Sequence, residues 1–225
     1  MAKEKKKKKN KVIEIKDKLT TPKKMAFFSM IVTLISFLYK IGLGIYSLSI
    51  ILMVASISTF LVLVCKFVFY KRMTGDRKQK KFAYLIMMVS ALAFSVLFLL
   101  FSVLKVGDID IHKENNYTGW LSYVFMGFII VMFVLSVIKL RGALQKSDIM
   151  VIGLKEMIFL SVLTDAVIIE EFLYKTVIIP LHLDALDLPF FPVLKYTNAY
   201  FPLITAVIML IIPLVMFNRY RKYEA

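Results

Sequence analysis

Residues 157–180 read MIFLSVLTDAVIIEEFLYKTVIIP, an apolar stretch long enough to cross a bilayer that nevertheless carries Asp165, Glu170, Glu171 and Lys175. A charged side chain at membrane depth costs at least about 2.5 kcal/mol on insertion scales. These charges therefore require buried partners or a water-lined cavity. They predict a helix in the interior of a multi-pass membrane protein.

The composition indicates the same class of protein. Hydrophobic residues make up 60% of the 225 residues, and the mean hydropathy is +0.77. A soluble domain has about 45–50% apolar residues. Several apolar runs have the length of about 20 residues that crosses the hydrocarbon core as a helix. We expect an all-α polytopic membrane protein.

Hydropathy and charge together predict six transmembrane helices. Lys40, Gly42 and Gly44 predict a tight turn between the first two helices, and the fifth helix begins at either Met150 or Met157. The bundle then occupies residues 25–218, between a tail at 1–24 and a short basic tail at 219–225. The expected spans are 25–42, 46–69, 82–106, 119–138, 150–179 and 199–217.

The charges outside these spans predict the orientation. Lysine and arginine gather at 71–81, 139–146 and 219–222, whereas the connections at 108–114 and 184–187 are acidic or mixed. By the positive-inside rule both termini are cytoplasmic. The chain has 25 lysines and five arginines, a balance typical of an AT-rich bacterial genome, and we therefore expect a bacterial plasma membrane.

The N-terminal tail holds eleven lysines before Met25, including the run Lys5, Lys6, Lys7, Lys8 and Lys9. Beside a spanning segment, such a run is a topology signal that also contacts anionic lipid at the cytoplasmic face, at about 1 kcal/mol per contact. The tail lacks aromatic residues, so we expect it to be disordered. The expected partner of this charge is lipid, not nucleic acid.

The fifth predicted helix is charged on several sides. At 100° per residue, Glu170, Glu171 and Lys175 lie about 140°, 240° and 280° around the axis from Asp165. A helix of this kind has no broad face to place against lipid, so we expect it to be central and wrapped by the other five. Glu171 and Lys175 are four residues apart in the favourable order for an intrahelical ion pair.

Counting depth from Met25 and Met157 places Lys40, Glu170 and Glu171 at about the same level. We therefore expect an interhelical contact between Lys40 and one of these two acids. The same count puts Asp165 near the midplane, with no basic residue evident at its level. Asp165 either stays protonated and hydrogen-bonded across helices or binds a proton or cation as part of a pathway.

Sequence motifs for redox, metal or nucleotide chemistry are missing. Cys65 is the sole cysteine, and the chain has no phosphate loop, dinucleotide fingerprint or zinc-protease motif. His182, Asp184 and Asp187 fall near prolines in an expected outer loop, which favours a loop over a metal site. We expect no metal and no cofactor.

The segment Glu170-Glu171-Phe172-Leu173-Tyr174-Lys175 resembles the EExxxR motif of the CPBP family, the CAAX-type intramembrane proteases. The resemblance implies paired glutamates that activate a water for peptide cleavage. Lys175 stands where the motif has arginine. The family also places histidines in later helices, whereas the one histidine after the motif here is His182.

Three classes of function remain open. The small size and basic cytoplasmic face favour a non-catalytic subunit or accessory component of a membrane complex, with a membrane-protein partner or a second copy of the chain. The alternative is a small proton- or ion-coupled transporter or channel that uses Asp165, Glu170 or Glu171. The third is a CPBP-like protease.

Overall fold

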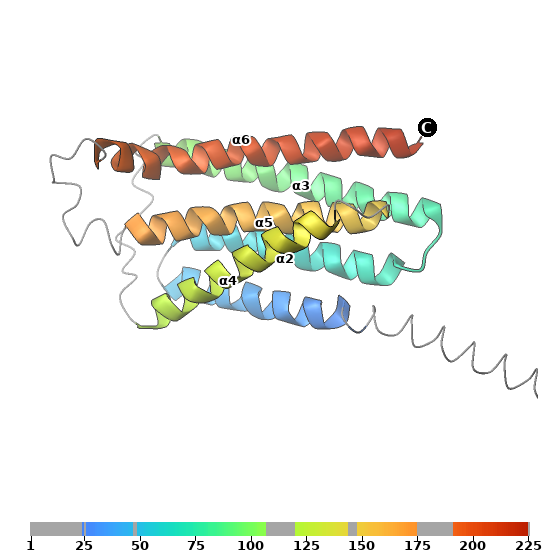
Figure 1. Ribbon diagram of the computed structural model, residues 1–225, viewed down its shortest axis with the longest axis horizontal. Coiled ribbons are helices and arrows are strands. Elements are labelled where there is room, and N and C mark those ends of the chain that lie inside the picture. Colours follow the sequence, from blue (N-terminus) through green and yellow to red (C-terminus); the bar gives the residue numbers. More distant parts are fainter. Residues whose placement is uncertain are drawn as a thin grey trace, which may run out of the picture.

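The computed structural model describes residues 24, 26–46, 49–106, 120–143, 148–174 and 191–224. These residues form helices and no strand. The helices run side by side in an elongated bundle, which α4 crosses obliquely (Figure 1). They are the first helix (Ala26–Tyr46), α2 (Ile50–Arg72), α3 (Arg77–Val106), α4 (Trp120–Ala143), α5 (Ile149–Leu173) and α6 (Phe191–Glu224).

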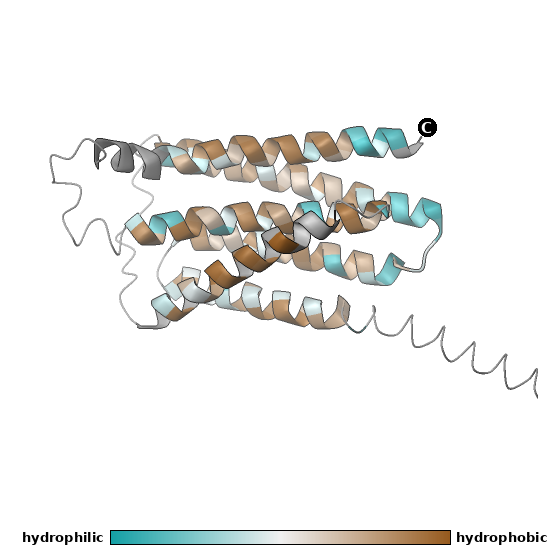
Figure 2. Cartoon of the chain, viewed as in Figure 1, coloured by the Kyte–Doolittle hydropathy of each residue, from teal (hydrophilic) through white to brown (hydrophobic). Residues whose placement is uncertain are grey.

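Four of the described helices are long and apolar enough to cross a membrane: Ala26–Tyr46, α2, α3 and the Tyr200–Lys222 part of α6. Hydrophobic residues cover much of these helices, and hydrophilic residues gather around the α2–α3 turn and the C-terminal part of α6 (Figure 2). Large apolar side chains such as Leu38 and Leu100 are exposed on the outside of the bundle, where hydrocarbon would solvate them. The fold is that of a helical membrane protein.

The charged helix α5 lies at the centre of the bundle. It packs against α2, α3, α4 and α6, and Asp165 binds Lys40 of the first helix. The prediction of a central helix is confirmed. Its acids Glu156, Asp165 and Glu171 are buried among the other helices, as expected because lipid cannot solvate them.

Hydroxyl groups join α3 to α6. Ser102 donates to Pro202 O at 3.1 Å, and Ser95 lies 3.0 Å from Met209 O. Pro213 lacks the N–H that would otherwise bond the carbonyl four residues earlier, which is Met209 O. Ser95 therefore supplies a donor to a carbonyl that its own helix leaves unpaired, as backbone in a membrane requires.

The predicted tight turn at Gly42 and Gly44 is wrong, because the first helix continues through both glycines to Tyr46. Gly44 instead allows α2 to approach closely. A Cβ added to Gly44 would lie 3.2 Å from Met53 N and 3.3 Å from Leu52 Cβ. The backbone N–H of Ser49 then donates to Gly44 O at 2.9 Å as the chain enters α2.

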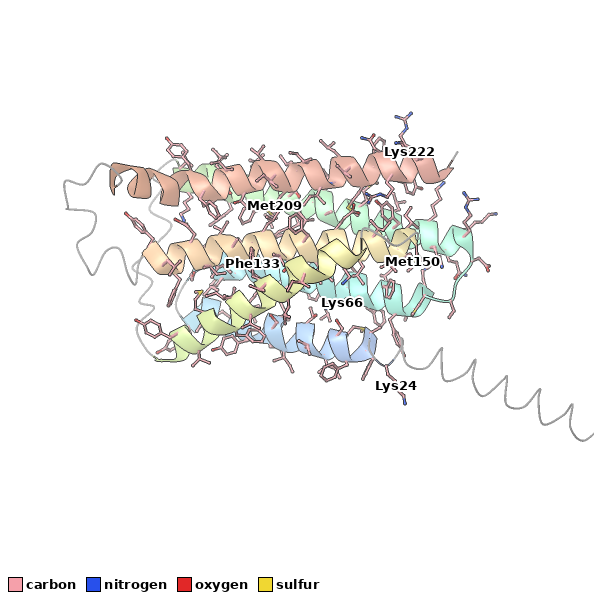
Figure 3. All side chains as sticks on the ribbon, in the orientation of Figure 1. Lys24, Lys66, Phe133, Met150, Met209 and Lys222 are labelled. Carbon is pink, nitrogen blue, oxygen red and sulfur yellow. The ribbon has the colours of Figure 1, made fainter. Side chains whose placement is uncertain are left out.

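One end of the bundle, which we call the basic end, carries the α2–α3 turn, the beginning of α5 and the C-terminal part of α6 (Figure 1). Lys24, Met150 and Lys222 all lie toward it (Figure 3). Here α3 begins at Arg77 and α6 continues through Arg219 to Glu224, beyond the apolar spans predicted from hydropathy. Long basic side chains tolerate such positions because their charged ends reach water.

Candidate functional site

A buried ion pair joins the first helix to α5. Lys40 Nζ donates to Asp165 Oδ1, and their side chains are 3% and 9% exposed. Lys40 Nζ also donates to Thr59 Oγ1 of α2 at 3.1 Å. Nearby, Ser58 and Ser161 place their hydroxyl oxygens 3.3 Å apart between α2 and α5. Three helices thus meet at one charged centre.

The expectation that Lys40 pairs with Glu170 or Glu171 is wrong, as is the expectation that Asp165 has no basic residue at its level. The error lies in counting depth from Met157, the later of the two predicted starts; the observed start agrees with the earlier one, Met150. The helix begins at Ile149, where Asp148 accepts from Met150 N at 3.0 Å as the N-cap. Eight further residues before Met157 add about 12 Å of helix and bring Asp165 level with Lys40.

A polar stripe leads from the basic end toward this ion pair. Ser29, Thr33, Ser36 and Lys40 are spaced by four, three and four residues, so they share one face of the first helix. Lys66 of α2 donates to Ser29 Oγ at 2.8 Å and to Thr33 Oγ1. The stripe therefore faces α2, inside the protein.

A cavity of about 750 Å³ follows the stripe. It lies between the first helix, α2 and α5, with Leu135 of α4 in its wall, and Lys40 and Asp165 are among its lining residues. The described lining residues are Lys24, Phe28, Ser29, Val32, Thr33, Ser36, Lys40, Thr59, Val62, Lys66, Leu135, Lys155, Ile158, Ser161, Val162 and Asp165.

The predicted site residues Glu170 and Glu171 lie further along α5, away from this cavity. Glu171 is 1% exposed, and Lys105 of α3 donates to its Oε2 at 3.4 Å. Glu170 Oε2 is buried and has no hydrogen-bond partner among the described residues. Lys175 lies outside the described residues, and so does the predicted pair with Glu171.

Sequence reasoning missed a second network at the basic end. Arg219 of α6 donates to Glu156 Oε1, and the hydroxyl of Tyr84 lies 3.4 Å from Glu156 Oε2 and 3.2 Å from Met216 O. Glu156 directly precedes Met157, the later of the two predicted starts of the fifth span, and Arg219 follows the predicted sixth span. The sequence did contain a signal for this network: an acid near one end of a span, and a base near the end of a neighbouring span that lies on the same side.

Several other predictions fall outside what the structure describes. Lys5, Lys6, Lys7, Lys8 and Lys9 belong to this group, as does the expected outer loop with His182, Asp184 and Asp187. Among the described residues, no group of three or more histidine, cysteine, aspartate or glutamate side chains could hold a metal ion.

Comparison of the chain with protein-family models, with curated proteins and with solved structures gave no match. The fold and the buried charges define a helical membrane protein with a charged interior. Its function has to be inferred from the geometry of its own side chains.

Proposed function

We propose that the chain is a small ion-coupled transporter with six transmembrane helices and both termini in the cytoplasm of a bacterium. The observation that carries the proposal is the Lys40–Asp165 ion pair, which lies in the wall of a cavity that Lys24 also lines. A polar route from one end of the bundle to a buried charged pair is what a coupled transporter needs on one side of the membrane.

The orientation is part of the proposal. The α2–α3 turn, with Arg72 and Arg77 beside it, and the basic end of α6 lie at the same end of the bundle (Figure 1). Positive charge at one end supports a cytoplasmic location for it. The cavity then opens from the cytoplasmic half of the plasma membrane.

The ion pair is suited to act as a switch. In a low-dielectric interior, Lys40 and Asp165 attract each other strongly, but each is costly to leave alone. A proton on Asp165, or an anion that competes for Lys40, would release the contact between the first helix and α5. Either event couples the occupancy of the cavity to the packing of two helices.

The geometry favours this function over the two others. The accessory-subunit function explains neither the cavity nor a charged pair in its wall. The protease-like motif places Glu171 against Lys105, at 3.4 Å, which favours a structural role for this acid.

The test is proton movement into vesicles that contain the purified full chain and total bacterial membrane lipid, with a trapped pH dye. An imposed potential, negative inside, should acidify the lumen faster than in protein-free vesicles. Asp165→Asn should abolish the difference. Asp148→Asn is the matched control, because it changes an acid of the same helix outside the described cavity lining and asparagine also caps helices well.

If vesicles with the wild-type protein acidify no faster than protein-free vesicles, the transporter proposal is overturned. Mass analysis of the protein after gentle detergent extraction separates the remaining possibilities. A partner that co-purifies in stoichiometric amount, together with the absence of proton movement, would indicate that the chain is an accessory subunit of a membrane complex.

A further inference from the structure

The charge of the cavity determines what it attracts. Its described lining contains four lysines, Lys24, Lys40, Lys66 and Lys155, and one carboxylate, that of Asp165. An excess of positive charge in a cleft with low-dielectric walls concentrates anions. The ligand should therefore be an anion.

Hydrogen bonds hold one of these lysines, Lys66, in place. Lys66 Nζ donates to Ser29 O at 3.1 Å, to Ser29 Oγ at 2.8 Å and to Thr33 Oγ1. All three acceptors are uncharged oxygens of the first helix, and these bonds orient the ammonium group of Lys66. A preorganised cation binds an anionic group at a lower entropic cost.

The remaining wall is apolar. Phe28 and Val32 of the first helix, Leu135 of α4 and Ile158 and Val162 of α5 line it. Cations and hydrocarbon in one cavity fit an amphiphile whose charged group meets the lysines while its chain contacts the apolar side chains. A free inorganic anion would leave these apolar contacts unused.

We propose that the cavity binds the phosphate headgroup of an anionic lipid taken from the leaflet at the basic end of the bundle. Basic pockets between transmembrane helices on the cytoplasmic side bind the headgroups of acidic phospholipids. The inference names the substrate class of the proposed transporter, and it depends on that function for the assignment of the leaflet. The acyl chain lies between the first helix and α4, and the hydroxyl stripe continues from the headgroup toward Lys40.

The test measures binding directly, on the full chain in detergent micelles. A phosphatidylglycerol with a fluorescent acyl chain should bind saturably, and a phosphatidylcholine with the same chains at least about tenfold more weakly. Glycerol 3-phosphate should not compete at a hundredfold excess. Competition by glycerol 3-phosphate would show that the site binds a soluble phosphate. Equal binding of both lipids would show that the site does not distinguish lipids by headgroup charge. Either result overturns the proposal.

Two lysines of α2 provide a matched pair of variants. Lys66→Gln should weaken phosphatidylglycerol binding about fivefold, the effect of one cation near an anionic headgroup. Lys71→Gln should leave it unchanged, because Lys71 lies over the Phe67 ring at 4.6 Å and is not among the described lining residues. Equal losses in both variants would indicate general surface attraction and overturn the site. If Lys66→Gln does not fold, Lys155→Gln gives the same readout.

The lipid-binding proposal and the transporter proposal can be refuted independently of each other. Selective lipid binding without proton movement would leave this site in place and overturn the transporter. Proton movement together with equal binding of the two lipids would support the transporter and overturn the lipid site.

Discussion

Lys40 and Asp165 are 125 residues apart in the chain and form a buried ion pair. Lys40 Nζ also donates to Thr59 Oγ1, so three helices share one charged contact. Removing one partner of a buried pair leaves an uncompensated charge, which costs about 3–5 kcal/mol. We expect Lys40→Met to lower the free energy of unfolding by about this amount, as measured in mixed detergent micelles.

The double variant Lys40→Met, Asp165→Leu removes both charges and should recover most of that loss. It should also lose proton movement in vesicles. A double variant no more stable than Lys40→Met alone would show that the pair does not set the stability of this contact.

Tyr84 and Gly153 provide a test of how closely α3 and α5 pack. A Cβ on Gly153 would lie 2.6 Å from Tyr84 Cδ2. The ring cannot move away easily, since it is stacked on Tyr220 and its hydroxyl donates to Met216 O at 3.2 Å. Gly153→Ala should therefore cost about 1–3 kcal/mol of unfolding free energy.

The matched control for this variant is Gly127→Ala in α4, where a Cβ would meet nothing within 4 Å in the described structure. Alanine is the better helix former, so this change should be neutral or stabilise by up to about 1 kcal/mol. Similar effects at the two glycines would contradict the close approach of Tyr84.

The central place of α5 could be predicted from sequence because lipid excludes charge from every face of a spanning helix. The partners of its acids could not. Axial depth follows from the residue count only when the helix start is known, and the start at Ile149 depends on the cap by Asp148, outside the apolar run. The arrangement of neighbours around α5, which pairs Glu171 with Lys105, is set by packing between distant segments.

Glu170 and Glu171 should respond differently to the same substitution. Glu171 is buried against Lys105, so Glu171→Gln should destabilise the protein by about 3 kcal/mol because the charge of Lys105 loses this carboxylate. Glu170 Oε2 has no hydrogen-bond partner within the described ranges, and Glu170→Gln should cost less than about 1 kcal/mol. Unfolding in mixed micelles measures both. Equal costs would show that Glu170 has a partner of its own.

The contact of Ser95 with Met209 O should depend on Pro213. Ser95 Oγ lies 2.8 Å from Ala91 O and 3.0 Å from Met209 O, so its one proton is shared between two carbonyls. We expect Ser95→Ala to cost about 1 kcal/mol. In a Pro213→Ala background, the N–H of the new alanine can bond Met209 O, and Ser95→Ala should cost less. A double-mutant cycle without coupling would refute this role of Ser95.

The proposed orientation can be tested with the sole cysteine left in place, because Cys65 is buried in α2 and should not react with a membrane-impermeant maleimide. Thr74→Cys lies in the turn between α2 and α3, at the basic end, and Asn116→Cys lies in the expected outer connection. In intact cells Asn116→Cys should be labelled and Thr74→Cys should not, and both should be labelled after lysis, since the positive-inside rule places the basic end in the cytoplasm. Labelling of Thr74→Cys in intact cells would invert the topology. It would also move the lysine-lined cavity to the outer leaflet, and the anionic lipid that we propose for it would then have to come from that side.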